Sequence, residues 1–225
     1  MNKKGLTFLG RGSAFNYLED NTCAYFIIDK HLFLFDCGEK IASKIIYLKL
    51  LDNIEKVSIF ITHLHSDHIG SLEGLLTFIK VFKTDIEVNV IYPNKDKLST
   101  LLKLLNFDFD IDILDKYDSE ELSVKIISQP HIGECYGFIV KSKEVNFFYS
   151  GDTSKINDEA LKMLLNGELD YFYHEVSRKQ SSFHTGLETL EKLIPNEFRS
   201  KVYLMHFSDD KLMFECIEKG FNVVR

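Results

Sequence analysis

The feature that most constrains the fold is a succession of short apolar runs, which alternate with segments of helical spacing and end in polar residues. Runs rich in β-branched and aromatic residues predict strands at 5–10, 23–29, 31–38, 57–63, 87–93, 122–128, 136–142, 145–150, 169–175, 201–206 and 221–224. Apolar positions at helical spacing predict helices at 39–51, 67–82, 95–106, 155–166, 187–194 and 210–219. So many apolar strands need cover on both faces. This predicts an α/β chain with two sheets packed face to face and helices outside.

Composition narrows the class of protein. The 225 residues contain no repeat, low-complexity tract or clear linker, so one domain over 1–225 is expected. The net charge of −7 argues against a general phosphate-binding surface. No apolar run approaches the roughly 18 residues of a membrane span, and the N-terminus has no leader-like apolar segment. A cytoplasmic enzyme is therefore expected, with four scattered cysteines that serve only in packing: Cys23, Cys37, Cys135 and Cys216.

The strongest chemical signal is THLHSDHIG at 62–70. His63 and His65 are two residues apart, so both rings project to the same side of an extended segment. Asp67 and His68 are adjacent, so their side chains diverge where a helix begins. One pair is therefore expected to bind one metal and the other a neighbouring metal, with zinc favoured by imidazole and carboxylate ligands. The alternative is a solvated polar turn that happens to be rich in histidine.

Further candidate ligands follow later strands. His131 lies in SQPHIGE, Asp152 in SGDTS and His206 at the end of VYLMH. A single oxygen of Asp152 is expected to bridge two cations about 3.5–4 Å apart, as in two-metal hydrolases. Gly151 beside it has no side chain to block a close approach. Each histidine taken alone could equally be an ordinary surface or core-edge residue.

The order HxHxDH, His, Asp, His resembles the metallo-β-lactamase superfamily over essentially the whole chain. The resemblance implies an αββα sandwich of two mixed sheets and a site for two Zn²⁺, with Mn²⁺, Fe²⁺ or Co²⁺ as other candidates. In that pattern His63, His65 and His131 hold the first metal, Asp67, His68 and His206 hold the second, and Asp152 bridges them. Asp36 in LFLFDCG matches a buried aspartate that supports the ligands from behind; its alternative is an ordinary turn residue.

Three segments are similar to ribonuclease Z and its phosphodiesterase relatives: FLGRGSAF (8–15), YHEVSRKQSSFHTG (173–186) and YLMHF (203–207). This resemblance implies that His184 donates a proton to the leaving oxygen and that Glu175 orients His184. It also implies attack by a metal-bound hydroxide, which Asp67 orients and from which it accepts the proton. His174 and His31 are expected to be structural, the first at a strand end and the second in a hairpin turn.

The resemblance leaves the substrate open. Ribonuclease Z carries a flexible arm that grips tRNA between the equivalents of His131 and Asp152, and here that interval fits only two strands and a tight turn. Arm-less phosphodiesterases, which include host enzymes and phage anti-Pycsar proteins that cleave cyclic nucleotides, are more similar. A small phosphodiester or cyclic nucleotide is therefore the expected substrate. The alternatives are tRNA 3′ processing, carboxyl-ester or lactone hydrolysis, and a non-catalytic metal-binding module. The family also suggests a homodimer.

Two loops are candidates for the entrance to the site. Arg178 and Lys179 in the loop 177–183 are expected either to meet a phosphate or to lie in solvent. In the first loop Arg11, Ser13 and Phe15 are expected either to line the entrance, with Phe15 stacking on a base, or to pack at the edge of the core.

Overall fold

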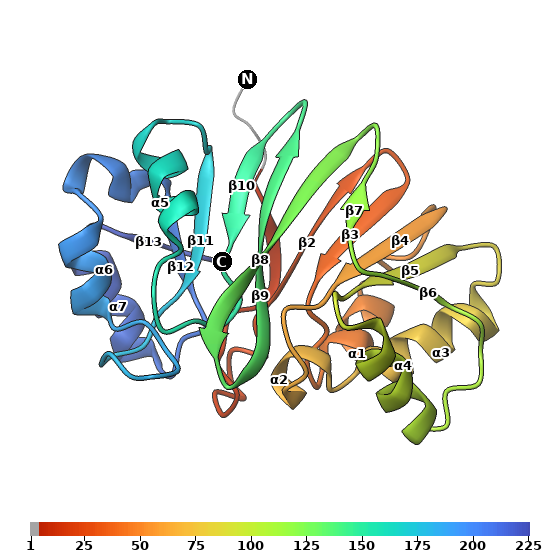
Figure 1. Cartoon of the computed structure of the whole chain (residues 1–225). Helices are drawn as coiled ribbons and strands as arrows, with labels where there is room; N and C mark the ends of the chain where they lie inside the picture. The colour runs from red at the N-terminus through yellow and green to blue at the C-terminus, as the bar shows by residue number, and fades with distance from the viewer. Residues whose placement is uncertain (1–4) are drawn as a thin grey trace.

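The structure is a computed structural model that describes residues 5–225. Residues 1–4, which open the N-terminal segment considered above for a leader, lie outside the described residues. Two sheets pack face to face and helices cover both outer faces (Figure 1). The predicted sandwich of two mixed sheets is therefore confirmed.

The first sheet has six strands, which neighbour one another in chain order. They are β1 (Thr7–Gly10), β2 (Cys23–Ile28), β3 (His31–Phe35), β4 (Lys56–Phe60), β5 (Glu87–Ile91) and β6 (Asp112–Leu114). The strands from β1 to β3 are antiparallel, and those from β3 to β6 are parallel.

The second sheet has seven strands and the same division. They are β7 (Tyr117–Asp118), β8 (Leu122–His131), β9 (Gly133–Ser142), β10 (Asn146–Tyr149), β11 (Tyr171–Glu175), β12 (Val202–Met205) and β13 (Asn222–Val223). The strands from β7 to β10 are antiparallel, and those from β10 to β13 are parallel.

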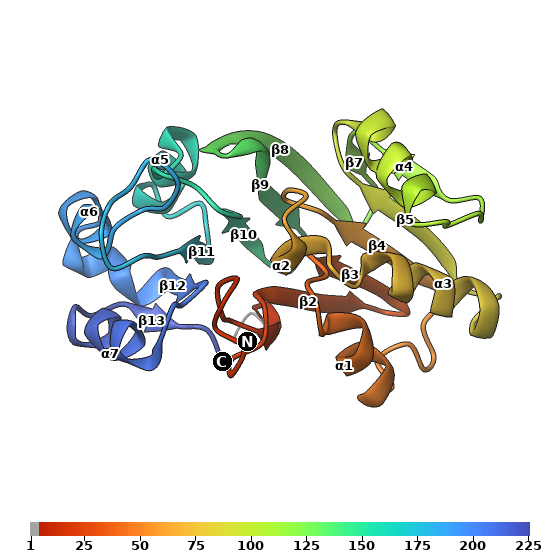
Figure 2. The same cartoon turned by 90° about the horizontal axis from the view of Figure 1, so that it is seen from below.

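The helices divide between the two outer faces (Figures 1 and 2). The first sheet carries α1 (Ile41–Tyr47), α2 (Ser66–Ile69), α3 (Leu72–Phe82) and α4 (Lys95–Leu104). The second carries α5 (Asp158–Leu165), α6 (Leu187–Leu193), α7 (Asp210–Glu218) and the 3₁₀ helix η1 (Asn196–Lys201). Among residues 5–225, none of these helices has both the length and the apolar character needed to cross a bilayer.

Strand periodicity explains why fully apolar strands suit this architecture. In β3, Leu32 and Leu34 pack in the cluster between the first sheet and its helices, whereas Phe33 and Phe35 pack between the two sheets. Successive side chains point to opposite faces of a sheet, so a strand covered on both faces needs apolar residues at every position. All five residues of β3 are buried, including His31.

Several sequence-based boundaries were wrong. The predicted helix 67–82 is interrupted at Gly70 and Ser71, because the Ser71 hydroxyl donates to Gly38 O and accepts from the Ala42 amide, which draws the chain toward α1. The helix predicted at 39–51 ends at Tyr47. Strands β6 and β7 were missed in an Asp-rich segment, and β8 continues through His131 instead of ending at Ser128 because its hairpin with β9 pairs to the tip.

His31 is structural but does not lie in the hairpin turn. It begins β3, is buried, and its ring stacks on Phe33 with centroids 3.8 Å apart. Its Nε2 lies 2.9 Å from Ser58 Oγ and its Nδ1 lies 3.1 Å from Glu121 Oε2. The ring therefore links β3 and β4 to the β7–β8 turn of the second sheet.

The four cysteines are buried and free. Burial raises the pKa of Cys37 to about 12, so its thiolate is scarce at neutral pH. This agrees with a packing role.

Phe35 is the centre of the aromatic cluster between the sheets, with ring centroids 5.1–6.1 Å from those of Phe26, Phe60, Phe138, Phe147 and Tyr149. We expect Phe35→Ala to lower the free energy of unfolding by about 3–5 kcal/mol, because it leaves a cavity between two sheets that cannot collapse locally. Urea unfolding measures this. Phe82→Ala, at a position that is 70% exposed, is the control and should change stability by less than about 0.5 kcal/mol. Equal losses in both variants would contradict this account of the core.

Candidate metal centre

The predicted site residues come from strand ends and meet at one edge of the sandwich, the side seen in Figure 2. Parallel strands in both sheets bring their carboxyl ends to this edge, so residues far apart in the chain become neighbours. His63 and His65 follow β4, and Asp67 and His68 lie on α2; from the second sheet come His131 at the end of β8, Asp152 after β10 and His206 after β12.

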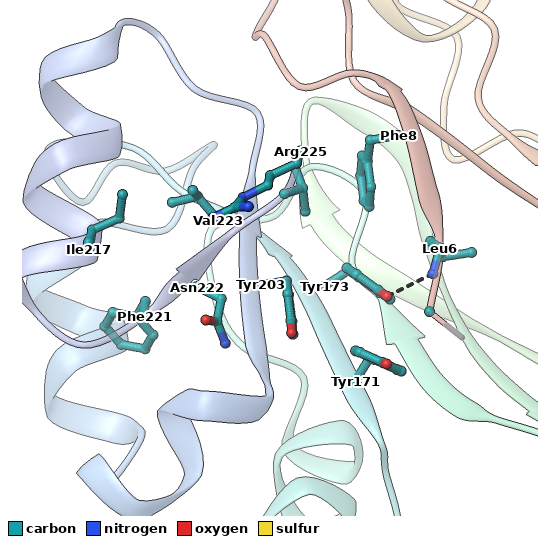
Figure 3. Close-up of a pocket in the computed structure, with 12 residues that line it drawn as sticks. Leu6, Phe8, Tyr171, Tyr173, Tyr203, Ile217, Phe221, Asn222, Val223 and Arg225 are labelled. Carbon is teal, nitrogen blue, oxygen red and sulfur yellow. Dashed lines mark hydrogen bonds between the residues drawn. The ribbon is translucent and has the colours of Figure 1, made fainter. Parts of the chain in front are cut away.

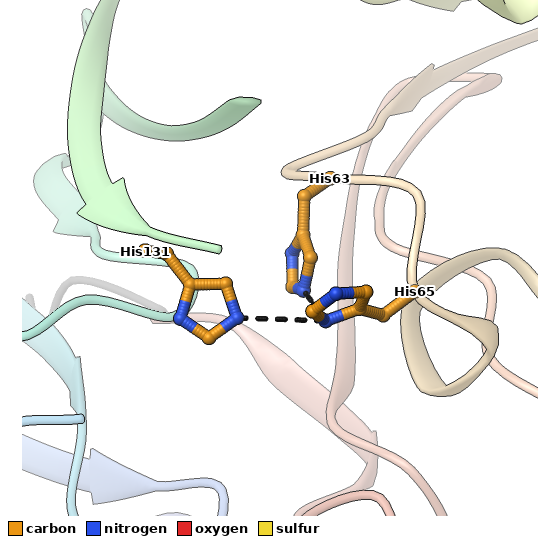
Figure 4. A group of neighbouring side chains, drawn as sticks. All are labelled: His63, His65 and His131. Atoms are coloured by element: carbon orange, nitrogen blue, oxygen red, sulfur yellow. Dashed lines mark hydrogen bonds between the residues drawn. The ribbon is translucent and has the colours of Figure 1, made fainter. Parts of the chain in front are cut away.

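Three histidines form the first group (Figure 4). His65 Nδ1 lies 2.9 Å from His63 Nε2 and 3.4 Å from His131 Nε2. A tetrahedral zinc ion bound at about 2.0–2.1 Å places its nitrogen ligands about 3.3–3.4 Å apart, so this group approaches the required spacing. His63 and His131 present Nε2 to the site, whereas His65 presents Nδ1.

Asp67, His68, Asp152 and His206 form the second group. Asp67 Oδ2 lies 3.3 Å from the Nε2 atoms of both His68 and His206. Asp152 Oδ1 lies 3.4 Å from the same two nitrogens. These four distances match the ligand spacing around a tetrahedral cation.

Asp152 lies between the groups and offers one oxygen to each. While Oδ1 faces His68 and His206, Oδ2 lies 3.9 Å from His63 Nε2 and 3.7 Å from His131 Nε2. The carboxylate thus presents a different oxygen to each group. The single-oxygen bridge expected from the sequence stays a prediction.

Unusual backbone conformations at or next to several of these residues direct their side chains toward the site. Asp36 and His206 have φ angles of 63° and 64°, in the left-handed region that costs about 1–3 kcal/mol for a residue other than glycine. Gly151, before Asp152, has φ 60°, and a Cβ there would lie 2.7 Å from Tyr136 O. Only glycine fits at that position, so the chain can bring Asp152 close to the first sheet.

Asp36 fixes the ring of His68 from behind. Its Oδ2 lies 2.9 Å from His68 Nδ1, and its Oδ1 accepts a hydrogen bond of 2.8 Å from the Thr62 amide. The Thr62 hydroxyl also donates to Asp36 and lies 3.0 Å from His63 Nδ1. Because Nδ1 of each histidine is engaged in this way, Nε2 is left as the lone-pair nitrogen that faces the groups above.

The surroundings of His68 Nε2 indicate whether a cation fits the second group. Within residues 5–225, nothing forms a hydrogen bond of acceptable geometry with the buried His68 Nε2, although two carboxylate oxygens lie within 3.4 Å. A buried nitrogen left in this way is costly unless a metal accepts its lone pair. The imidazole and carboxylate donors are also the types that divalent transition metals prefer.

The charges of the site are consistent with metal ligation. Burial lowers the pKa of His63 to about 2, which keeps its ring neutral and its lone pair available. Burial opposes ionisation of Asp67, but the contact of its carboxyl with His206 and the nearby ring of His68 hold its pKa below the usual range. Asp152 is likewise ionised despite its burial, because His206 and His68 lower its pKa.

His184 and Glu175 adjoin this centre. The His184 ring lies between those of His131 and His206, with centroids 5.2 Å and 5.5 Å away. Its Nδ1 is 3.4 Å from Glu175 Oε1, and this carboxylate raises the pKa of His184. Glu175 is fully buried, and its Oε1 accepts from the Thr185 amide at 2.8 Å. The ring of His184 therefore adjoins both groups, with a fixed carboxylate near its Nδ1.

The structure does not support a phosphate contact by Arg178 or an entrance role for Arg11. Arg178 donates to Asp209 at 2.8 Å and to Glu215 at 2.5 Å, so it anchors its loop to α7. Arg11 pairs with Glu19 and donates to Val224 O. Both guanidinium groups have carboxylate partners on the protein.

The first loop contacts the residue that follows His206. The Ser13 amide donates to Phe207 O, one residue after His206, while Phe15 is highly exposed on the same loop. His174 is buried, stacks on Phe172, and has a pKa lowered to about 4 by burial, which agrees with a structural role.

Sequence reasoning missed Thr62 and the carbonyl of Phe183. The first bonds Asp36 and His63, and the second accepts a hydrogen bond from His131 Nδ1 at 2.9 Å. Thr62 directly precedes the first histidine of the motif, and this was the only signal available for it. A backbone carbonyl leaves no signal in a sequence.

A separate cavity of about 510 Å³ lies toward the amino ends of β11 and β12, away from the metal centre (Figure 3). Tyr171, Tyr173 and Tyr203 line it together with residues of β1 and β13. It contains none of the candidate ligands.

The sandwich and its paired His/Asp groups define a metal-dependent hydrolase of the metallo-β-lactamase fold, in its ribonuclease Z-like phosphodiesterase branch. The family described as Anti-Pycsar protein Apyc1 matches residues 4–107 and 94–224. The chain belongs to this family.

Individual relatives agree with this assignment. The chain is 29% identical to an Anti-Pycsar protein Apyc1 of Paenibacillus sp. (strain J14), with 98% of this chain and 96% of that protein covered. It is 28% identical to a ribonuclease Z of Archaeoglobus fulgidus, covering 96% and 71%. The crystal structure of human tRNase Z, short form, shares the fold with a TM-score of 0.72 at 22% identity, covering 98% of this chain and 95% of that one.

We expect Asp36→Asn to weaken divalent metal binding by about 10- to 100-fold, because the ring of His68 loses the carboxylate that orients it. Competition with a chromophoric chelator measures the affinity. Thermal unfolding of the metal-free variant separates this effect from misfolding. A folded Asp36→Asn protein with unchanged affinity would contradict the orienting role.

Proposed function

We propose that this chain is a two-metal phosphodiesterase that hydrolyses small cyclic nucleotides. The observation that carries the proposal is Asp152, whose two oxygens face two separate ligand groups. A carboxylate shared in this way is typical of sites where a pair of divalent cations acts on one phosphate. Membership of a family described as anti-Pycsar and the resemblance to cyclic-nucleotide phosphodiesterases support the substrate class.

The proposed ligands follow the two groups. His63, His65 and His131 hold the first cation and Asp67, His68 and His206 hold the second, with Asp152 between them. We propose zinc at both positions, since imidazole and carboxylate ligands suit it, although Mn²⁺, Fe²⁺ or Co²⁺ would accept the same set. When bound, such cations lower the pKa of water and neutralise charge on a phosphate.

The side chains of the protein then divide the proton transfers. Asp67 is ionised, and its carboxylate orients the attacking water and accepts its proton. His184 carries a proton at Nε2, because Glu175 at Nδ1 favours the protonated ring. As the bond between phosphorus and the ribose oxygen breaks, His184 gives this proton to the leaving oxygen.

The connection between β9 and β10 favours a small substrate over tRNA. These strands pair closely, with Asn146 opposite Lys141, and only residues 143–145 join them. This is the interval in which ribonuclease Z is expected to carry its tRNA-binding arm. A net charge of −7 also disfavours a long polyanion, whose affinity rests mainly on phosphate contacts.

We also propose that the sandwich acts as one hydrolase domain and assembles as a homodimer. The aromatic cluster shared by the two sheets supports the first statement. The second rests on the family resemblance alone, and analytical ultracentrifugation tests it.

The substrate assay uses zinc- and manganese-loaded protein with 2′,3′- and 3′,5′-cyclic nucleotides and with a precursor tRNA. Turnover of a cyclic nucleotide at kcat/KM of about 10⁴ M⁻¹s⁻¹ or above is the expected result. Cleavage of the tRNA alone would replace the proposal with RNA processing. Inactivity on both, in metal-loaded protein, would favour an ester or lactone substrate.

We expect His184→Ala to retain bound metal and to lose about 10²- to 10⁴-fold in kcat, because it removes only the general acid. Asp67→Ala should lose both metal and activity, since its carboxylate belongs to the second group. Metal content by elemental analysis and steady-state rates separate the two variants. A His184→Ala enzyme with normal kcat would remove His184 from the mechanism.

A further inference from the structure

The loop at 177–186 is fixed by its own polar side chains. Gln180 Nε2 donates to Ser154 O at 2.7 Å and to Ser181 O at 2.9 Å, while its Oε1 accepts from the Gly186 amide at 3.0 Å. A Cβ on Gly186 would lie 2.4 Å from the backbone nitrogen of Gln180, and the Ser177 amide donates to Thr185 O at 2.8 Å, which joins the two ends of the loop. The loop is therefore a closed, preorganised unit.

The tip of this loop is equally well bonded. Ser181 Oγ accepts from the amides of Phe183 at 3.1 Å and His184 at 2.9 Å. The same turn thus positions the proposed general acid and the residue before it. A group that contacts Phe183 therefore has a fixed position relative to His184.

Phe183 contributes in two ways at the metal centre. Its carbonyl accepts a hydrogen bond from His131 Nδ1, and its ring centroid lies 6.4 Å from that of His131, nearly perpendicular at 83°. The ring is 43% exposed. Ile132, which follows His131 at the β8–β9 turn, is 52% exposed. An ordered apolar surface therefore borders the first ligand group.

Of the two basic side chains considered for phosphate contact on this loop, Arg178 is already engaged, because its guanidinium is paired with Asp209 and Glu215. The phosphate of a substrate is accommodated by the ligand groups themselves. What remains of a nucleotide is its ribose and its flat aromatic base, which must lie next to the wall of the site. An exposed aromatic ring at that wall is complementary to the face of a base.

We propose that the ring of Phe183 binds the nucleobase of the substrate by stacking. This inference rests on the proposed function, since it assigns the base-binding side of the same site. It makes Phe183 a specificity-determining residue that favours nucleotides over phosphodiesters without a base. Because every base has a π-face, stacking alone recognises bases as a class.

The test compares Phe183→Ala with wild type on a 3′,5′-cyclic nucleotide and on the cyclic phosphate of 1-O-methylribose, which has no base. The variant should lose about 5- to 150-fold in kcat/KM on the nucleotide, mainly through KM. It should change less than about twofold on the base-free compound. Phe183→Leu, which keeps apolar volume but not the ring, should lie between. Phe82→Ala is the control for an exposed phenylalanine on α3 and should behave as wild type on both.

A binding measurement separates failure of this inference from failure of the proposed function. Calorimetric titration of the metal-loaded proteins with a nucleoside monophosphate and with ribose 5-phosphate gives the contribution of the base without turnover. Suppose that wild type hydrolyses cyclic nucleotides. The inference is then wrong, and the proposed function stands, if Phe183→Ala hydrolyses them equally well. The same holds if its kcat/KM falls by the same factor on the nucleotide and on the base-free compound. If wild type hydrolyses neither but Phe183→Ala weakens binding of the nucleotide alone, the inference stands and the proposed function fails. If wild type neither hydrolyses cyclic nucleotides nor binds the nucleotide more tightly than the sugar phosphate, both are overturned.

Discussion

The carboxylate of Asp36 lies fully buried, with donors from Thr62, His68 and Tyr149 around it. These donors come from the ends of β4 and β10 and from α2, so one charged group joins both sheets to the segment that carries HxHxDH. A buried carboxylate is stable only when its oxygens accept hydrogen bonds. The same bonds that stabilise Asp36 also fix which nitrogen of His68 faces the site, so the fold and the geometry of the centre depend on one network.

Much of the site could be predicted from the sequence because its signals are local. In HxHxDH the order of residues fixes their relative directions, and polar residues after apolar runs mark strand ends. Asp152 and His206 could be named as candidate ligands in this way before the sheets were known, and the family resemblance then gave each a proposed position in the set. The alternation of strands and helices already implied parallel pairing, and parallel strands bring their carboxyl ends to one edge of the sheet.

The rest depends on contacts between distant parts of the chain, which no local pattern contains. The sequence alone leaves Arg178 free to bind a phosphate, but Asp209, just before α7, and Glu215 on α7 bind its guanidinium more than 30 positions later in the chain. The break between α2 and α3 follows from bonds of Ser71 to α1 and the residues before it. The strands β6 and β7 have only three and two residues, too few to show an alternating pattern of their own, and they form by pairing with β5 and β8.

Each ligand group draws on both sheets. His63 and His65 come from the first and His131 from the second; in the other group, His68 comes from the first and His206 from the second. Neither half of the chain therefore contains a complete binding site. On the proposed ligand assignment, a cation is captured at the second group only after His206 has been synthesised and the two sheets have docked. On this assignment, metal selection needs both sheets to be folded, because an isolated HxHxDH segment offers too few ligands to retain an unsuitable ion.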